Sequence, residues 1–207
     1  DPSISKEFMG RVSSLLKKIS SDLDELIDIK LTLKTFPSIE GTPTIVIAGY
    51  PNVGKSTFMG NLTGSGVKIA SYPFTTTDIM IGHKTFRHQR YQIIDSPGLL
   101  DREMDERNRI ELQAILAMDE LADVILFIVD PTTDIRKQLN LLEEMRGKFE
   151  TEFVVAVNKI DLLVGGELEE FREGMGDIRF LEMSAINKED CTGVFNKIIT
   201  DTMLTAL

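Results

Sequence analysis

The stretch that decides the fold is GYPNVGKS, residues 49–56, which follows the apolar run TIVIA and opens an amphipathic segment. Glycines let such a loop curl so that backbone N–H groups point at phosphate oxygens, and the N-terminus of the following helix adds its dipole. Lys55 neutralises phosphate charge and Ser56 offers a hydroxyl to Mg²⁺. A chance match in a turn is the alternative, which the strand-before, helix-after context disfavours. The predicted nucleotide contacts here are Gly49, Pro51, Asn52, Val53, Gly54, Lys55, Ser56 and Thr57.

Around this loop, strand-like apolar runs alternate with amphipathic stretches. The runs are TIVIAG (44–49), DIMIGHKTF (78–86), YQIID (91–95), DVILFIVD (123–130), EFVVAVN (152–158) and IRFLEMS (178–184). Buried parallel strands read as continuous apolar runs, and crossover helices separate them. The second and third runs are joined by the short polar turn RHQR, so we expect them to pair as an antiparallel hairpin. The sequence therefore predicts an α/β fold with an about six-stranded, mostly parallel sheet and helices on both faces.

The first part of the chain has a different pattern. Residues 5–35 carry apolar side chains at helical spacing, and Pro37 ends the pattern before the linker SIEGTP. One long bent helix and a helical pair both fit. We expect an N-terminal helical segment at 1–40 and a nucleotide-binding domain at 41–207. Since the sequence begins with Asp1 and stops inside a helical pattern, we expect a fragment of a longer protein.

Composition limits the partners. Acidic residues exceed basic ones by 33 to 23, a net charge of −10, which argues against DNA and other non-specific nucleic-acid binding by the whole surface. The single cysteine, Cys191, excludes an internal disulfide, as is typical of a reducing compartment, and we read it as a small buried hydrophobe. No apolar run approaches the roughly 18 residues of a membrane span. We expect a cytoplasmic monomer with no membrane partner.

Two later motifs predict recognition of guanine. NKID, residues 158–161, follows a strand, where open α/β sheets bind ligands. Asp161 can accept hydrogen bonds from the ring N–H and amino group of guanine, a donor pair that adenine lacks. Asn158 can bond both base and loop, and the Lys159 stem can lie over the purine. In MSAI (183–186), the small Ser184 and Ala185 let a backbone N–H reach the guanine carbonyl. A solvated polar turn is the alternative for each motif alone; after a phosphate loop they predict GTP or GDP as ligand.

In this order, the motifs are the signature of a Ras-like P-loop G domain of the translation-factor class. The segments GYPNVGKST, SYPFTTTDIMIGH (71–83) and DSPGLLDREMDERNRIELQAI (95–115) resemble the Obg-like GTPases. Among these, the chain is most similar to the nucleolar GTP-binding protein family, in its archaeal form, over nearly its whole length. The resemblance implies a role in large ribosomal subunit assembly, with subunit precursors as partners, and a nucleolar location in a eukaryote.

The resemblance also assigns the switch residues. It implies that one threonine of SYPFTT binds Mg²⁺ and senses the γ-phosphate; Thr75, Thr76 and Thr77 compete, and Thr76 is favoured. Asp95 would hold Mg²⁺ through a water, and the Gly98 N–H would meet the γ-phosphate. The residues expected to carry catalysis are Lys55, Asn52, Thr76 and Gly98.

Hydrolysis is expected to be slow. Ras-like enzymes place a water-orienting glutamine after the switch glycine, and here that residue is Leu99. In related GTPases an asparagine at the position of Asn52 helps to coordinate K⁺, which implies stimulation by potassium. Asparagine chosen only for turn geometry is the alternative. A nucleotide-stabilised docking module with negligible hydrolysis is the alternative function.

Two charged segments remain open. DREMDERNR (101–109) reads equally as a solvated helix start and as a switch whose Arg102, Arg107 and Arg109 meet rRNA. The basic hairpin tip within HKTFRHQR (83–90) could contact RNA phosphates, although such tips are often basic without a partner.

Overall fold

The computed structural model describes residues 8–14, 17, 20, 27, 42–71, 78–101, 107 and 109–203. The chain divides into two compact units, Asp1–Ser38 and Ile39–Leu207. In the first unit, residues 8–14 are helical, and the large apolar side chains of Phe8 and Met9 are exposed. The rest of the helical pattern predicted over 5–35, and the boundary predicted after residue 40, lie largely outside the described residues.

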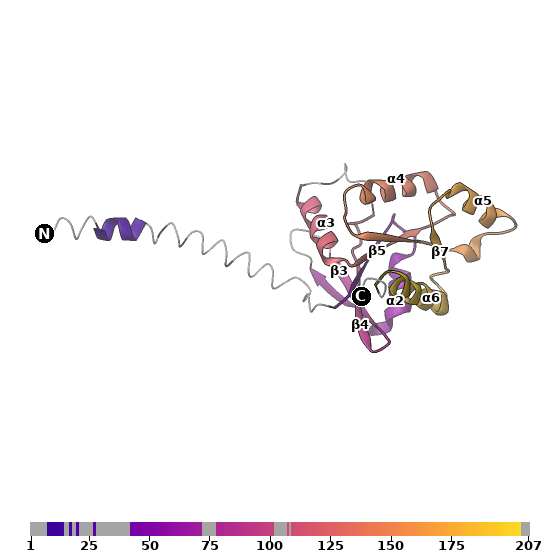
Figure 1. Cartoon of the computed structure of the whole chain (residues 1–207), viewed down its shortest axis with the longest axis horizontal. Helices are drawn as coiled ribbons and strands as arrows, with labels where there is room; N and C mark the ends of the chain where they lie inside the picture. The colour runs from indigo at the N-terminus through magenta and orange to yellow at the C-terminus, as the bar shows by residue number, and fades with distance from the viewer. Residues whose placement is uncertain are drawn as a thin grey trace. The chain divides into compact units, whose positions relative to one another are not determined.

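The second unit is built on a twisted sheet, which Figure 1 shows with helices on both sides. Its described strands are β1 (Thr44–Ala48), β2 (Lys68–Ser71), β3 (Asp78–Phe86), β4 (Gln89–Asp95), β5 (Val124–Val129), β6 (Glu152–Val157) and β7 (Phe180–Glu182). They are ordered β2-β3-β4-β1-β5-β6-β7. All neighbours from β4 to β7 pair in parallel, whereas β2–β3 and β3–β4 are antiparallel. The predicted α/β class is confirmed.

The helices follow the strands as crossovers. They are α2 (Lys55–Thr63), α3 (Arg109–Leu121), α4 (Ile135–Arg146), α5 (Glu167–Gly174) and α6 (Lys188–Ile198), and α6 continues as a π-helical turn at Ile199–Met203. Asp134 caps α4, because its carboxylate accepts from the N–H groups of Arg136 and Lys137. Asn187 caps α6 in the same way.

Alternation along β1 separates the two layers of the core. Ile45 and Ile47 belong to a buried cluster with residues of α2 and α6, and Val46, between them, points to the opposite face of the sheet. All five residues of β1 are buried. Because β1 lies at the centre of the sheet, the loop at its carboxyl end is held by a rigid support on both sides.

The predicted hairpin is confirmed, and its turn is tighter than RHQR suggests. Arg87 and His88 both have positive φ, 47° and 71°, as a two-residue type I′ turn requires. The sheet also contains a strand that the sequence did not predict, β2. Its residues KIAS lack a continuous apolar run because the strand lies at the sheet edge, where Ile69 is exposed.

Candidate functional site

The loop from Gly49 to Gly54 joins β1 to α2 in a conformation that only glycine allows at its ends. Gly49 has φ 135°, and a Cβ there would lie 2.3 Å from the Ile128 carbonyl oxygen. Gly54 has φ 103°, and a Cβ there would lie 2.2 Å from the Asn158 amide nitrogen. Asn52 is also left-handed, with φ 64°, so turn geometry is one sufficient reason for asparagine at that position.

Lys55 begins α2 and is almost fully buried. Its ammonium donates to the carbonyl oxygens of Gly49, at 2.7 Å, and Tyr50, at 2.8 Å. Burial lowers the pKa of Lys55, against the opposing effect of the nearby carboxylates of Asp95 and Asp101. Because its printed hydrogen bonds go to neutral carbonyl oxygens, this buried cation is well placed to attract an anion.

A cavity of about 320 Å³ opens beside this ammonium. It is lined by Pro51, Asn52, Gly54, Lys55, Ser56, Thr57, Pro97 and Asp101. Six of these residues were predicted from the loop motif, and the structure brings them together with two residues of the segment that follows β4. The cavity therefore has the lining that a bound phosphate chain needs, with backbone N–H groups, a cation and a hydroxyl.

Ser56, which lines the cavity, is bonded to Asp95, the buried last residue of β4. The Ser56 hydroxyl donates to Asp95 Oδ2 at 2.8 Å. Asp95 is fully buried, and its Oδ1 makes no hydrogen bond within the described part of the chain. Burial raises the pKa of Asp95, and the charge of Asp101 adds to this, while the Ser56 hydroxyl and Lys55 oppose it. A buried carboxylate oxygen without a donor next to a hydroxyl fits a hard divalent cation such as Mg²⁺.

The turn after Asp95 folds against the phosphate loop. Leu99 and Leu100 are buried, with exposed fractions of 2% and 1%. The Leu100 carbonyl accepts from the Gly49 N–H at 3.0 Å, and the Arg107 guanidinium donates to the Leu99 carbonyl. The Gly98 N–H donates to the Asp101 carboxylate at 2.9 Å. Arg107 is thus buried against this turn and does not offer the exposed surface that an RNA contact would need.

The NKID and MSAI loops contact each other, and NKID also contacts the phosphate loop. The Asn158 amide donates to the Val53 carbonyl at 2.7 Å, and its oxygen accepts from the Ala185 N–H at 2.7 Å. The Ser184 hydroxyl donates to the Asp161 carboxylate. Asn158 therefore ties the phosphate loop to the loop that precedes α6, and Ser184 orients the carboxylate expected to read guanine. Here the Ala185 N–H is engaged by Asn158 rather than left for a base.

Asp130 was missed as a site residue. It directly follows β5, is 1% exposed, and accepts from the Lys159 ammonium at 2.5 Å. The Thr132 hydroxyl also donates to it, at 2.6 Å, and Gln138 bonds its backbone N–H and carbonyl. Burial alone would raise the pKa of Asp130, but the Lys159 and Thr132 hydrogen bonds outweigh burial and lower it. An acidic residue at the carboxyl end of a central strand was the available signal.

Comparison with known proteins agrees with this geometry. Residues 44–159 match the profile of the family described as 50S ribosome-binding GTPase. The chain belongs to this family. Membership places it among GTP-binding domains that hydrolyse GTP.

Individual relatives show which members of the family this chain resembles. An uncharacterised protein of Methanocaldococcus jannaschii is 49% identical over 162 residues, which are 76% of this chain and 45% of that protein. Nucleolar GTP-binding protein 1 of Drosophila melanogaster is 35% identical over 178 residues, 83% of this chain and 27% of that protein. The chain thus spans less than half the length of either relative. The predicted resemblance to the nucleolar GTP-binding proteins is confirmed.

Solved structures give the same answer. A Plasmodium falciparum protein described as nucleolar GTP-binding protein 1 superposes with a TM-score of 0.64 at 29% identity, covering 83% of this chain and 93% of that one. The G domain of the Thermotoga maritima FeoB iron transporter superposes with a TM-score of 0.60 at 26% identity, covering 77% and 98%. The predicted Ras-like fold is confirmed.

Some predicted residues of the family's switch regions lie outside the described part of the chain. They are Thr75, Thr76, Thr77 and Arg102. For Arg109 the backbone alone is described, as the first residue of α3. The choice among the three threonines therefore remains a prediction.

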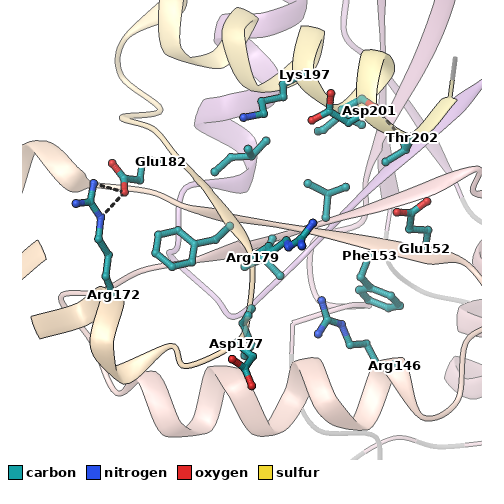
Figure 2. A pocket seen from close by; sticks show the side chains of 16 residues that line it. Arg146, Glu152, Phe153, Arg172, Asp177, Arg179, Glu182, Lys197, Asp201 and Thr202 are labelled. Atoms are coloured by element: carbon teal, nitrogen blue, oxygen red, sulfur yellow. Dashed lines mark hydrogen bonds and ion pairs between the residues drawn. The ribbon is translucent and has the colours of Figure 1, made fainter. Parts of the chain in front are cut away.

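A larger hollow, of about 1110 Å³, lies elsewhere, between β6, β7 and α6. Figure 2 shows charged side chains around it, including the Arg172–Glu182 ion pair, with 2.6 Å between Nη2 and Oε1. It is lined by none of the residues predicted to bind nucleotide. Its walls carry no glycine loop, so its size does not make it the nucleotide site of this GTPase family.

No helix in the described residues is long and apolar enough to cross a membrane.

Proposed function

We propose that this chain is a Mg²⁺-dependent GTP switch with slow intrinsic hydrolysis that acts in the assembly of the large ribosomal subunit. The observation that carries the proposal is the Asn158 side chain, which bonds Val53 of the phosphate loop and Ala185 of the MSAI loop. These two bonds join a phosphate cradle to a base-reading loop in one rigid site. Direct binding measurements with GTP, GDP and ATP test it: guanine nucleotides should bind and ATP should not.

The proposed base recognition depends on Asp161, Asn158 and Lys159. Asp161 would accept from the two donors of guanine, and the Ser184 hydroxyl already orients its carboxylate. The Lys159 ammonium is anchored by Asp130, so its aliphatic stem can lie against the purine ring. Adenine would leave the Asp161 carboxylate without donors, which disfavours it.

The proposed phosphate recognition uses the loop N–H groups and Lys55. Ser56 and Asp95 would hold Mg²⁺, the latter through a water, and Thr76 would complete the set. The ion supplies a positive charge that offsets the charge of the β and γ phosphates. Releasing Lys55 from the Gly49 and Tyr50 carbonyls would let its ammonium reach those phosphates.

Slow hydrolysis follows from the burial of Leu99. Its side chain is apolar and 2% exposed, so it neither reaches the cavity nor orients a water. We propose that K⁺ held near Asn52 supplies part of the missing charge, since phosphoryl transfer depends chiefly on positioning and electrostatics. Turnover measured in KCl and in NaCl at equal ionic strength should be faster in KCl. Equal rates would remove the potassium proposal.

The proposed ribosomal role is supported by the names of the family and of its relatives, and the geometry of the site is not used for it. The family is described by 50S binding, and several relatives are named for the nucleolus. We propose that the partners are precursors of the large subunit, and that a monomer acts in the cytoplasm, or in the nucleolus of a eukaryote. Co-sedimentation with such precursors should depend on GTP; equal recovery with GTP, GDP and no nucleotide would contradict it.

A docking module that only uses GTP to hold one shape is the second candidate, and the same Leu99 favours it. Single-turnover hydrolysis with Mg²⁺ and K⁺, with and without ribosomal subunits, separates the two. A rate that stays at the uncatalysed level in every condition would favour the docking module.

A further inference from the structure

The N–H of Gly98 donates to a side chain of the protein itself. Gly98 has φ 79°, a conformation that favours glycine. Its N–H donates to Asp101 Oδ2 at 2.9 Å. In the proposed function, that same N–H is the group that would meet the terminal phosphate of GTP. An anionic side chain of the protein thus holds the donor that an anionic ligand would need.

Asp101 is also part of the phosphate cavity. It lines this cavity together with Lys55 and Ser56. A carboxylate in this place would repel a terminal phosphate and compete with it for the Lys55 ammonium.

The turn just before Asp101 packs against the phosphate loop. Leu99 and Leu100 are buried, and the Leu100 carbonyl accepts from the Gly49 N–H. These contacts hold the segment just before Asp101 against the phosphate loop. The packed turn therefore brings the backbone of Asp101 to the edge of the cavity that its side chain lines.

We propose that Asp101 is a specificity-determining residue that favours nucleoside diphosphate over triphosphate, because its carboxylate occupies the Gly98 N–H until a terminal phosphate displaces it. The inference rests on the proposed function. A diphosphate does not extend to Gly98, so it leaves the Asp101 contact in place. A triphosphate must break a charge-assisted hydrogen bond and bring like charges together.

Two substitutions test the proposal. Asp101→Ala removes both the charge and the acceptor, and Asp101→Asn keeps the size and one acceptor oxygen while removing the charge. Affinities for a fluorescent non-hydrolysable GTP analogue and for fluorescent GDP, both with Mg²⁺, give a triphosphate-to-diphosphate ratio. Asp101→Ala should raise this ratio about tenfold, as the loss of one charge-assisted hydrogen bond implies, and Asp101→Asn should raise it by less.

Asp134 supplies a matched control. Its carboxylate also accepts from backbone N–H groups, those of Arg136 and Lys137, but it does not line the cavity. Asp134→Asn should leave the ratio unchanged. Thermal unfolding of each variant shows that it is folded; if Asp101→Ala is not, the isosteric Asp101→Asn decides.

The outcomes separate this inference from the proposed function. If the wild type binds neither guanine nucleotide, the proposed function is wrong. If the wild type binds both and the Asp101 variants leave the ratio unchanged, only the role of Asp101 is wrong. A ratio that falls would mean that Asp101 supports triphosphate binding, for instance by positioning a water or the cation, and would also overturn the inference.

Discussion

Replacing Gly54 with alanine should break the junction between the phosphate loop and the base-reading loop. The backbone there has φ 103°, and a new Cβ would lie 2.2 Å from the Asn158 amide nitrogen. A non-glycine residue in such a conformation costs roughly 1–3 kcal/mol. Moving Asn158 away also breaks its bonds to the Val53 carbonyl and the Ala185 N–H, each worth about 1 kcal/mol. We expect the free energy of unfolding to fall by about 4 kcal/mol.

The assay is urea denaturation of the nucleotide-free protein, followed by nucleotide binding. For a chain of this length the loss corresponds to a fall in Tm of about 10 °C. Gly60→Ala is the matched control, because Gly60 lies inside α2 and a Cβ there meets nothing within 4 Å. It should stabilise the protein by about 0.5–1 kcal/mol.

Two outcomes would contradict the expected effect of Gly54→Ala. If Gly54→Ala is as stable as Gly60→Ala, neither the strain nor the clash is real. The second outcome concerns Asn158. Adding Asn158→Ala removes the amide nitrogen that the new Cβ would meet, so the stability losses of the two single variants should add up to clearly more than the loss in the double variant. Additivity within about 0.5 kcal/mol would show that Asn158 is not what the methyl group displaces.

Three further predictions concern residues of the same site. Asp161→Asn should weaken GTP binding at least about a hundredfold, because a carboxylate that accepts from guanine is lost, and should improve binding of xanthosine nucleotides, as competition binding measures; unchanged GTP affinity would contradict the assignment. Asp130→Asn should lower the free energy of unfolding, because the lowered pKa of Asp130 means that folding stabilises its ionised form. The loss should be constant above about pH 5 and should shrink as the pH falls below 3.8. A difference between the two proteins that does not depend on pH in denaturation curves would refute this. Leu99→Gln should not speed single-turnover hydrolysis and should cost about 1–3 kcal/mol of stability, because the amide would be buried among apolar groups; faster turnover would show that this side chain reaches the cavity.

The sequence predicted the sheet well because its central strands are uniformly apolar. The runs at β1, β5 and β6 are long, β-branched and separated by amphipathic stretches, so their periodicity decides the class. It failed for β2, whose four residues at the sheet edge have little apolar pattern to read. Helix α5 was missed for a similar reason, since none of its residues is buried.

The candidate site was predicted where chemistry is local and missed where it depends on register. GYPNVGKS carries its own geometry, and most of its predicted contact residues line the cavity, although Gly49 and Val53 do not. The Lys159–Asp130 ion pair depends on the parallel pairing of β5 with β6, which places the ends of the two strands side by side. A linear pattern has no access to that neighbour. The burial of Leu99 likewise depends on tertiary packing. The sequence showed that this residue does not orient a water, but it did not predict that its side chain packs in the core.

The hydrogen bonds of the site run in one connected path. Ala185 donates to Asn158, Asn158 donates to Val53, and at the other end of the same loop Gly49 donates to Leu100. The loop predicted to bind the base at one end and the switch turn at the other therefore contact the same six-residue stretch of backbone, from Gly49 to Gly54. By thermodynamic reciprocity, a partner that holds the switch turn away from Gly49 must change the affinity for nucleotide by the same factor as nucleotide changes the affinity for that partner. Under the proposed function, a partner that binds this turn reads the nucleotide state without contacting the nucleotide.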